Sequence, residues 1–317
     1  MPRRSVVVML ALVVLAGCNA WRAEDPASEE NGTAVPSEAA LKPVGLVRLM
    51  EFHEDISGLM NWAYELEARG LKCLVCFQKN MLDMHPTEIR WFADNGHEVG
   101  GTYAEEPFWD LPYETQLEIM QETKELVEGV TGKPMRVFGS RYFAYDENTV
   151  KAADELGVEY LLARGTADVE ALIYQPEEYD CTIISVSNVA FGDMGRGSLC
   201  DYSLWARGST AADFEQVLDD ALAKQPKRIL IVSHCYLGGA KAEWWEAYEQ
   251  LLDSGDIEWA ADFDEWIMPR NGVNLAVPMS MIPENREVKY TTPAPAVPEE
   301  ELEDVDDLHN PCAAPVQ

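Results

Sequence analysis

The chain has 317 residues, of which 47 % are hydrophobic and 25 % charged, a composition typical of a folded globular protein rather than a disordered one. Its 24 basic and 56 acidic residues give a net charge of −32, which argues against nucleic acid as a partner and against docking on anionic lipid through a basic patch. Of the acidic residues, 42 fall between positions 45 and 269, which predicts a solvated acidic surface or, as a narrower hypothesis, an acidic groove for a cationic ligand.

The first 17 residues have the pattern of an export signal. A basic start precedes an apolar run over residues 6–15, which is too short to span a membrane because a spanning helix needs about 20 apolar residues. The sequence Leu-Ala-Gly-Cys that ends at Cys18 resembles the bacterial lipobox, and this implies that Cys18 becomes the lipidated first residue of the mature chain. An ordinary signal peptide with a chance cysteine is the alternative. We therefore expect an exported protein, held at the bacterial cell envelope only by its N-terminal lipid.

Two segments of biased composition flank the central part of the chain. Residues 18–44 are rich in Ala, Pro, Ser and Glu without periodicity, which predicts a flexible tether. Residues 269–317 are rich in Pro and acidic residues, which predicts a solvated tail. A folded domain is therefore expected over residues 45–268. Its Cys73 and Cys76 lie in an apolar run, where positions three apart face opposite sides of a strand, so we expect core residues rather than a metal pair.

Short apolar runs alternate with amphipathic stretches throughout the domain. Strands are predicted at 45–52, 71–77, 97–101, 135–138, 158–163, 181–186, 228–233 and 257–261. Helices are predicted at 56–69, 87–94, 113–130, 147–156, 211–223 and 242–252. Strands that alternate with helices in this way predict an α/β fold with a mostly parallel sheet, and seven or eight such units in a little over 220 residues favour a (β/α) barrel.

Polar residues follow several of the predicted strands. They are His53, Glu54 and Asp55 after the first, Glu105 and Glu106 after the third, Arg141 and Tyr142 after the fourth, and His234 at the seventh. Because chemistry in such barrels gathers at the C-terminal ends of the strands, we expect these side chains to converge on one site. Carboxylates and imidazoles can hold a divalent cation or act as base and acid. The alternative is that they are ordinary solvated loop residues.

Three stretches carry a resemblance to a known family. They are the segment Gly96-His97-Glu98-Val99-Gly100 with the later Pro107, the region of Phe138 and Tyr142, and the alternating apolar run that ends at His234. Together they resemble the polysaccharide deacetylase family, whose catalytic unit is the NodB homology domain, over about residues 45–268. The resemblance implies a NodB-like barrel and metal-dependent hydrolysis of acetyl groups on a glycan, so an acetylated carbohydrate is the expected partner. His97 is expected to be structural.

The first family motif, T-F-D-D, has a base followed by a metal ligand. Matching acid pair to acid pair assigns Glu54 as the base and Asp55 as the metal ligand, whereas matching on Phe52 assigns His53 and Glu54 to these roles. The resemblance with the first match implies that Asp55 contributes to a site for a divalent ion, either zinc or a harder cation, to which His53 would add a nitrogen ligand.

The remaining family positions are only partly kept. The two metal histidines of the family fall on Thr102 and Glu106 or, after a shift, on Gly101 and Glu105, and we carry Glu106 forward as a metal ligand. In the family's F-R-P-P-Y-G segment the arginine position is occupied by a glycine, while Arg141 lies two residues further on and Tyr142 keeps its place. The resemblance implies an oxyanion donor at the backbone N–H near Tyr142 and a general acid at His234.

Two functions are consistent with these residues. The first is a divergent deacetylase, a hydrolase that acts on an acetylated glycan of the cell envelope. The second is a lipid-anchored glycan-binding protein that keeps the barrel but has lost turnover. In that case Trp109, Trp244 and Trp245 would offer stacking surfaces for sugar rings.

Overall fold

The computed structural model describes residues 42–165, 169–191, 195–270 and 272–286. The expected signal peptide with Cys18, and the expected tether up to residue 41, lie outside these ranges. The acidic end of the chain after residue 286 also lies outside them. In the described ranges, no helix combines the length and the apolar character that a membrane crossing requires.

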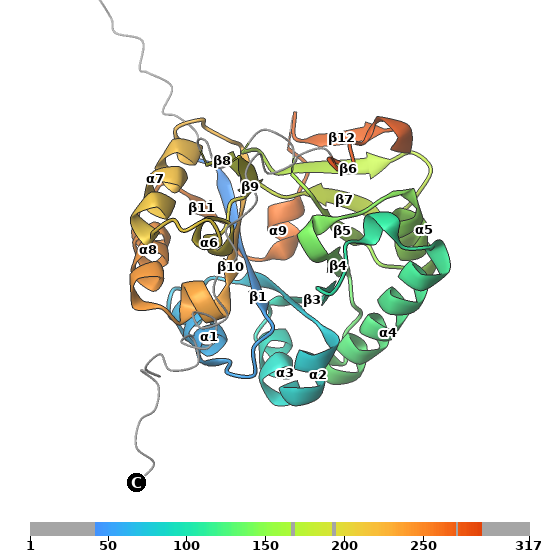
Figure 1. Cartoon of the computed structure of the whole chain (residues 1–317), viewed down its shortest axis with the longest axis horizontal. Coiled ribbons are helices and arrows are strands. Elements are labelled where there is room, and N and C mark those ends of the chain that lie inside the picture. Colours follow the sequence, from blue (N-terminus) through green and yellow to red (C-terminus); the bar gives the residue numbers. More distant parts are fainter. Residues whose placement is uncertain (1–41, 166–168, 192–194, 271, 287–317) are drawn as a thin grey trace, which may run out of the picture. The chain divides into compact units, whose positions relative to one another are not determined.

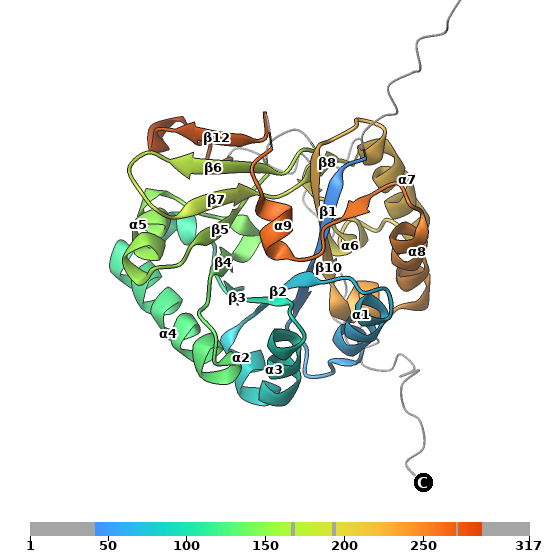
Figure 2. The ribbon, with the colours of Figure 1, turned by 180° about the vertical axis from the view of Figure 1, so that it is seen from behind.

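The described residues form a curled, mostly parallel β-sheet with helices around its outside (Figure 1 and, from behind, Figure 2). The strands are β1 Val44–Glu51, β2 Cys73–Phe77, β3 Glu98–Tyr103, β4 Val137–Ser140, β5 Tyr160–Ala163, β6 Leu172–Pro176, β7 Thr182–Ser185, β8 Asn188–Ala190, β9 Arg196–Ser198, β10 Arg228–His234, β11 Glu258–Trp259 and β12 Asn274–Val277. The order in the main sheet is β10-β1-β2-β3-β4-β5-β7-β6-β12, with β11 also paired to β1. Among its described pairs, β6 with β7 is antiparallel and the others are parallel; β8 and β9 form a separate antiparallel pair.

The helices begin and end largely where local sequence signals place them. They are α1 Ser57–Ala68, α2 Lys79–Met84, α3 Pro86–Asp94, α4 Tyr113–Thr131, α5 Glu147–Leu156, α6 Asp201–Trp205, α7 Ala211–Leu222, α8 Ala242–Asp253 and α9 Phe263–Ile267. Helix α5 is an example, because the side chain of Asp146 accepts a hydrogen bond from the backbone N–H of Thr149, and Gly157 ends the helix with φ of 69°.

Strand β1 lies between β10, the first strand in the sheet order, and β2. All eight of its residues are buried, as expected of a parallel strand covered on both faces. Side chains alternate along it, so Val47 and Leu49 pack in the apolar cluster shared with the helices, whereas Leu46 packs in a second cluster inside the curl. Met50 of β1 pairs with His234 of β10, so these two strands end side by side.

Helix α9 lies inside the curl of the sheet (Figure 1). Its Trp266 is fully buried against Leu46 and its neighbours, and the indole Nε1 donates to the carbonyl of Ile229 at 3.1 Å. Leu46 and Ile229 are near the starts of their strands, so α9 fills the N-terminal end of the barrel. Open space is therefore left at the opposite end, where His234 and the other strand ends lie.

The expected (β/α) barrel is confirmed, with differences in detail. The eight predicted strands match β1 to β5, β7, β10 and β11, but the short strands β6, β8, β9 and β12 were not predicted. β12 pairs with β6, although its residues fall in the segment expected to be a solvated tail. The folded domain therefore extends past residue 268. Cys73 and Cys76 are buried and unbridged in β2, as expected of core residues.

Candidate functional site

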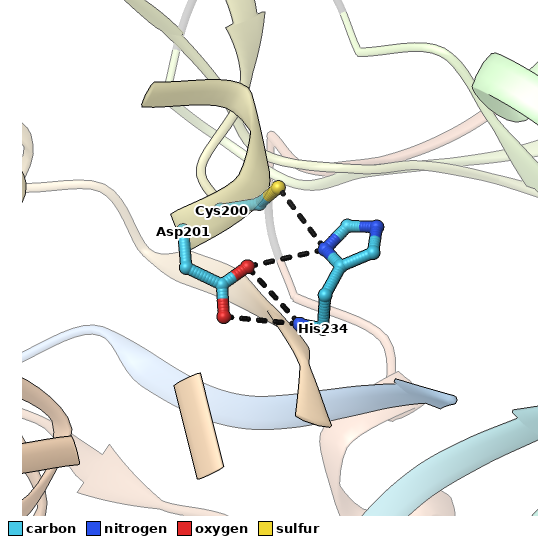
Figure 3. Close-up of side chains that lie close together, drawn as sticks. All are labelled: Cys200, Asp201 and His234. Atoms are coloured by element: carbon cyan, nitrogen blue, oxygen red, sulfur yellow. Dashed lines mark hydrogen bonds and ion pairs between the residues drawn. The ribbon is translucent and has the colours of Figure 1, made fainter. Parts of the chain in front are cut away.

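A histidine and an aspartate from different elements meet at the C-terminal end of β10. His234 is the last residue of β10, and Asp201 is the first residue of α6. His234 Nδ1 lies 3.1 Å from Asp201 Oδ1, and the His234 backbone N–H lies 3.0 Å from both carboxylate oxygens. In Figure 3 the second ring nitrogen of His234 points away from Asp201 and Cys200. Asp201 therefore engages Nδ1 and leaves Nε2 available for a ligand.

The carboxylate of Asp201 is held rigidly by hydrogen bonds. It is fully buried, and it accepts from the Ser233 hydroxyl at 2.9 Å and from the Tyr202 backbone N–H at 2.6 Å. Ser233 Oγ in turn accepts from the indole Nε1 of Trp62 at 3.0 Å. A buried carboxylate held by this many donors fixes the orientation of the imidazole beside it.

The surroundings of His234 favour its protonated form. Burial by itself lowers the pKa of the imidazole, but the neighbouring Cys200 sulfur and Asp201 carboxylate outweigh burial and raise the pKa to about 9. At neutral pH the ring is therefore cationic and can donate a proton or a charged hydrogen bond through Nε2. This arrangement suits a general acid and suits equally the binding of a negatively charged or acceptor group.

Cys200, Asp201 and His234 form the one group of three nearby metal-type ligands in the described part of the chain. Cys200 Sγ lies 3.6 Å from the same His234 Nδ1 that faces Asp201 (Figure 3). A metal here would have to displace the Nδ1 proton and compete with the donors that surround the Asp201 carboxylate. The three residues are therefore satisfied as a hydrogen-bonded cluster, and they do not supply the Asp-His-His donor set that the family resemblance implies.

The residues assigned to metal binding from the sequence do not gather at one point. Asp55 is exposed, and its Oδ1 accepts from the backbone N–H of Ser57 at the start of α1. Glu106 is exposed as well, whereas Thr102 is buried with its hydroxyl donating to the carbonyl of Gly139 at 2.9 Å. His53 instead packs its ring 4.2 Å from that of Tyr236. The described residues therefore do not fit the family's metal ion.

The carboxylate at the end of β1 is Glu51, which sequence analysis did not single out. Glu54, assigned there as the base, is exposed in the following loop. Glu51 is fully buried; its Oε1 accepts from the backbone N–H groups of Phe52 and His53 at 2.8 Å each, and its Oε2 has no hydrogen-bond partner. Burial raises its pKa to about 8, so it is mostly protonated at pH 7. The signal in the sequence that could have identified Glu51 is a glutamate inside a predicted strand that is otherwise mostly apolar.

A cavity of about 1080 Å³ opens at the C-terminal ends of the strands. This volume is slightly above the range of about 300–1,000 Å³ usual for small-molecule sites. Of the eight polar residues predicted at the strand ends, four line the cavity, namely Glu105, Arg141, Tyr142 and His234, whereas His53, Glu54, Asp55 and Glu106 do not. The aromatic side chains in its wall are Phe52, Trp109, Tyr142, Phe143, Tyr202 and Tyr236.

The turn after β4 carries backbone strain at the wall of this cavity. Tyr142 has φ of 59° and Phe143 has φ of 55°, a region that costs side-chain-bearing residues about 1–3 kcal/mol. Strain of this kind is typical of functional sites, and here it places the exposed Tyr142 ring beside Arg141, whose guanidinium lies 5.0 Å from the ring centroid.

Burial and packing show which of the remaining predicted residues, three tryptophans and His97, can reach the cavity. Trp109 lines the cavity, but Trp244 is buried against Phe214 and Trp245 packs edge-on against Trp62, so neither is part of its wall. His97 is buried, and burial lowers its pKa to about 4, in keeping with a structural histidine.

Comparison with known proteins identifies the fold. Residues 63–161, from α1 to β5, match the family model described as polysaccharide deacetylase. No curated protein matches the sequence. The resemblance to the polysaccharide deacetylase family is therefore confirmed over this segment.

Solved structures agree on the same fold at low sequence identity. A Mycobacterium smegmatis protein assigned as a polysaccharide deacetylase has TM-score 0.55 and 16 % identity, over 70 % of this chain and 88 % of that chain. A similarly assigned protein from Pseudomonas aeruginosa PAO1 has TM-score 0.52 and 18 % identity, over 70 % and 89 %. A CE4 family pseudoenzyme from Bacillus anthracis has TM-score 0.50 and 12 % identity, over 72 % and 66 %. Identities this low speak to the fold alone.

Proposed function

We propose that this chain, which carries a polysaccharide deacetylase domain match at residues 63–161, binds an envelope carbohydrate and does not deacetylate it by metal chemistry. The observation that carries the proposal is the placement of the candidate metal ligands. Asp55 and Glu106 are exposed outside the cavity wall, and Thr102 bonds to the backbone of β4. Without these donors, the described residues do not offer the carboxylate and imidazole ligands that would hold a water-activating ion.

The cavity supports carbohydrate binding on its own terms. Aromatic rings stack on the apolar faces of sugars. Trp109, Tyr142 and Tyr202 line the same cavity as His234. The His234 imidazolium, oriented by Asp201, offers a hydrogen-bond donor for a sugar oxygen. The same fold is found in a protein named as a CE4 family pseudoenzyme, which supports a barrel that is kept while turnover is lost.

A second candidate function is hydrolysis of an acyl group, and the Asp201–His234 pair is the observation that favours it. Such a pair is the usual arrangement of a general acid, and the backbone N–H near Tyr142 would serve as the oxyanion donor. Under this proposal, His234→Ala lowers the rate by roughly 10²–10⁴, the range expected for a general acid.

The two candidates are separated by measurements on the full chain purified in detergent. We expect chitotetraose or peptidoglycan fragments to bind in isothermal titration calorimetry, with the same affinity in EDTA and in added Zn²⁺, and without release of acetate. Asp55→Ala is expected to leave binding unchanged. Acetate release that requires a metal, and that Asp55→Ala abolishes, would overturn the proposal and establish the deacetylase.

Anchoring at the cell envelope through Cys18 is also a proposal, supported by the lipobox-like sequence before it. Cys18→Ser is expected to leave the signal uncut or to release the protein from membranes. Normal processing and unchanged membrane fractionation in this variant would contradict it.

A further inference from the structure

The cavity wall has a charge opposite to that of the chain. Of the eleven arginines in the described residues, six line the cavity: Arg48, Arg141, Arg164, Arg196, Arg207 and Arg286. Glu105 is the one carboxylate among the described lining residues. From the net charge of −32, an acidic groove was the narrower hypothesis, but the lining of this cavity is mainly basic.

Arg48 is the most deeply placed of these arginines. It lies on β1 with 1 % of its surface exposed, and its guanidinium stacks 5.0 Å from the centroid of Phe143. Nη1 lies 3.4 Å from the Met50 sulfur, a weak acceptor, and Nε has no hydrogen-bond partner. Because arginine keeps its charge even when buried, a guanidinium without an anion is unfavourable there unless a ligand supplies one.

Two further arginines of the wall also lack a carboxylate partner among the residues that the structure describes. Arg196 on β9 has Nε and Nη2 buried without hydrogen-bond partners. Arg141 donates to the backbone carbonyl of Glu105 and to the Tyr142 hydroxyl, and it forms no ion pair with a described carboxylate. These two residues and Arg48 come from three different elements, so the arrangement is not a consequence of neighbouring positions in the sequence.

Two arginines outside the cavity show that carboxylate partners are available on this acidic chain. Arg69 contacts Glu65, Glu249 and Asp253 within 3.8 Å. Arg136 likewise contacts three carboxylates, on Glu98, Glu159 and Asp264, within 3.2 Å. With so many acidic residues in the chain, unpaired guanidinium groups gathered around one cavity require an explanation other than a shortage of partners.

We propose that the cavity binds an acidic saccharide, whose carboxylate or phosphate group is held by Arg48, Arg141 and Arg196 while aromatic side chains of the wall contact its sugar ring. The planar guanidinium fork matches carboxylate and phosphate oxygens in bidentate geometry. This inference rests on the proposed carbohydrate binding and names the class of carbohydrate. It also gives the cationic His234 a role as a further donor to the anion.

The test compares acidic sugars with counterparts in which the acidic group is esterified or absent. The full chain in detergent is titrated by calorimetry with trigalacturonate and with its neutral methyl ester, and separately with glucose 6-phosphate and glucose. We expect each acidic sugar to bind about ten- to a hundredfold more tightly than its neutral counterpart, and the difference to shrink in high salt. The carboxylate and phosphate arms identify which anion the cavity prefers.

Variants locate the effect in the cavity. Arg196→Gln and Arg141→Gln are expected to weaken binding of the acidic sugar about tenfold each and to leave binding of its neutral counterpart nearly unchanged. Arg90→Gln is the matched control, because Arg90 is exposed on α3, outside the cavity wall, and its loss removes the same charge. The buried Arg48 is left intact so that folding is not at stake.

The outcomes separate this inference from the proposed function. Equal binding of acidic and neutral saccharides, unaffected by Arg196→Gln, overturns the anion site and leaves carbohydrate binding standing. If no saccharide binds but inorganic phosphate raises the melting temperature, and Arg196→Gln removes that rise, the anion site stands and the saccharide is overturned. Absence of binding by every one of these probes overturns both.

Discussion

Replacing Asp201 by asparagine removes the negative charge that lies 3.1 Å from the His234 imidazole while keeping the shape of the side chain. The pKa of His234 in the native protein is raised from the ordinary 6.5 to about 9. At about 1.4 kcal/mol per pH unit, this corresponds to about 3 kcal/mol in favour of the protonated folded state. In Asp201→Asn the burial of His234 and its contact with Cys200 are retained, so we expect the pKa of His234 to fall below about 9 by the part of the rise that the carboxylate supplies.

The sign of the stability effect follows from the direction of the shift. A histidine whose pKa is higher in the folded than in the unfolded state contributes its full stabilisation below about pH 6.5 and loses it as the pH rises through about 9. The free energy of unfolding of the wild type should therefore fall by up to about 3 kcal/mol across this range because of His234. Asp201→Asn should reduce this component of the pH dependence, and the remainder is the part that Cys200 supplies.

Two measurements check the reasoning. Imidazole resonances followed by NMR between pH 5 and pH 10 give the pKa of His234 directly, and urea unfolding at several pH values gives the stability. Asp83→Asn is the matched control, because it removes an exposed carboxylate on α2. A wild-type His234 that titrates below 6.5, or one that titrates unchanged in Asp201→Asn, would refute the role assigned to the carboxylate.

Burial raises the pKa of Glu51 to about 8, so stability contributed by its protonated form is lost as the pH rises from about 4.5 to about 8. We expect Glu51→Gln to stabilise the protein at pH 8 by up to about 5 kcal/mol and to have no such effect at pH 4.5. The exposed Glu54→Gln is the control and should leave stability unchanged at both pH values. If urea unfolding at pH 8 shows no gain in stability for Glu51→Gln, the prediction is wrong. Gly58→Ala on α1 would place its Cβ 2.1 Å from the carbonyl oxygen of Cys235 and should destabilise by about 1–3 kcal/mol. In Gly129→Ala on α4 the added Cβ meets no atom within 4 Å, so this variant should be more stable by about 0.5–1 kcal/mol. If both variants shift the thermal unfolding temperature in the same direction, the close packing of Gly58 against Cys235 is wrong.

Structural features that depend only on residues close together in the chain could be predicted from the sequence. The alternation of apolar runs with amphipathic stretches predicts β1 to β5 and α3 to α5, because burial on both faces of a strand or one face of a helix repeats at short range. The cap at Asp146 and the stop at Gly157 are local hydrogen-bond and dihedral effects. His234 at the end of an apolar strand was placed at the site for the same reason.

Features that depend on residues far apart in the chain were decided only by the tertiary structure. Asp201 lies 33 residues before His234, and no spacing rule connects them, because it is the packing of α6 on β10 that joins the two side chains. Glu51 and Glu54 are three positions apart, yet the end of β1 falls between them and buries the first while exposing the second.

The electrostatic character of the cavity is the clearest case. Summed along the chain, charge is strongly negative, and the six arginines of the cavity wall are spread from position 48 to position 286 without any local cluster. The fold brings Arg48 on β1, Arg141 after β4 and Arg196 on the separate β8–β9 pair to one cavity, while many carboxylates pair with bases elsewhere. Sequence fixes which charges exist, but only strand order and register determine which of them share a site, because electrostatic and hydrogen-bonding partners are set by distance in space.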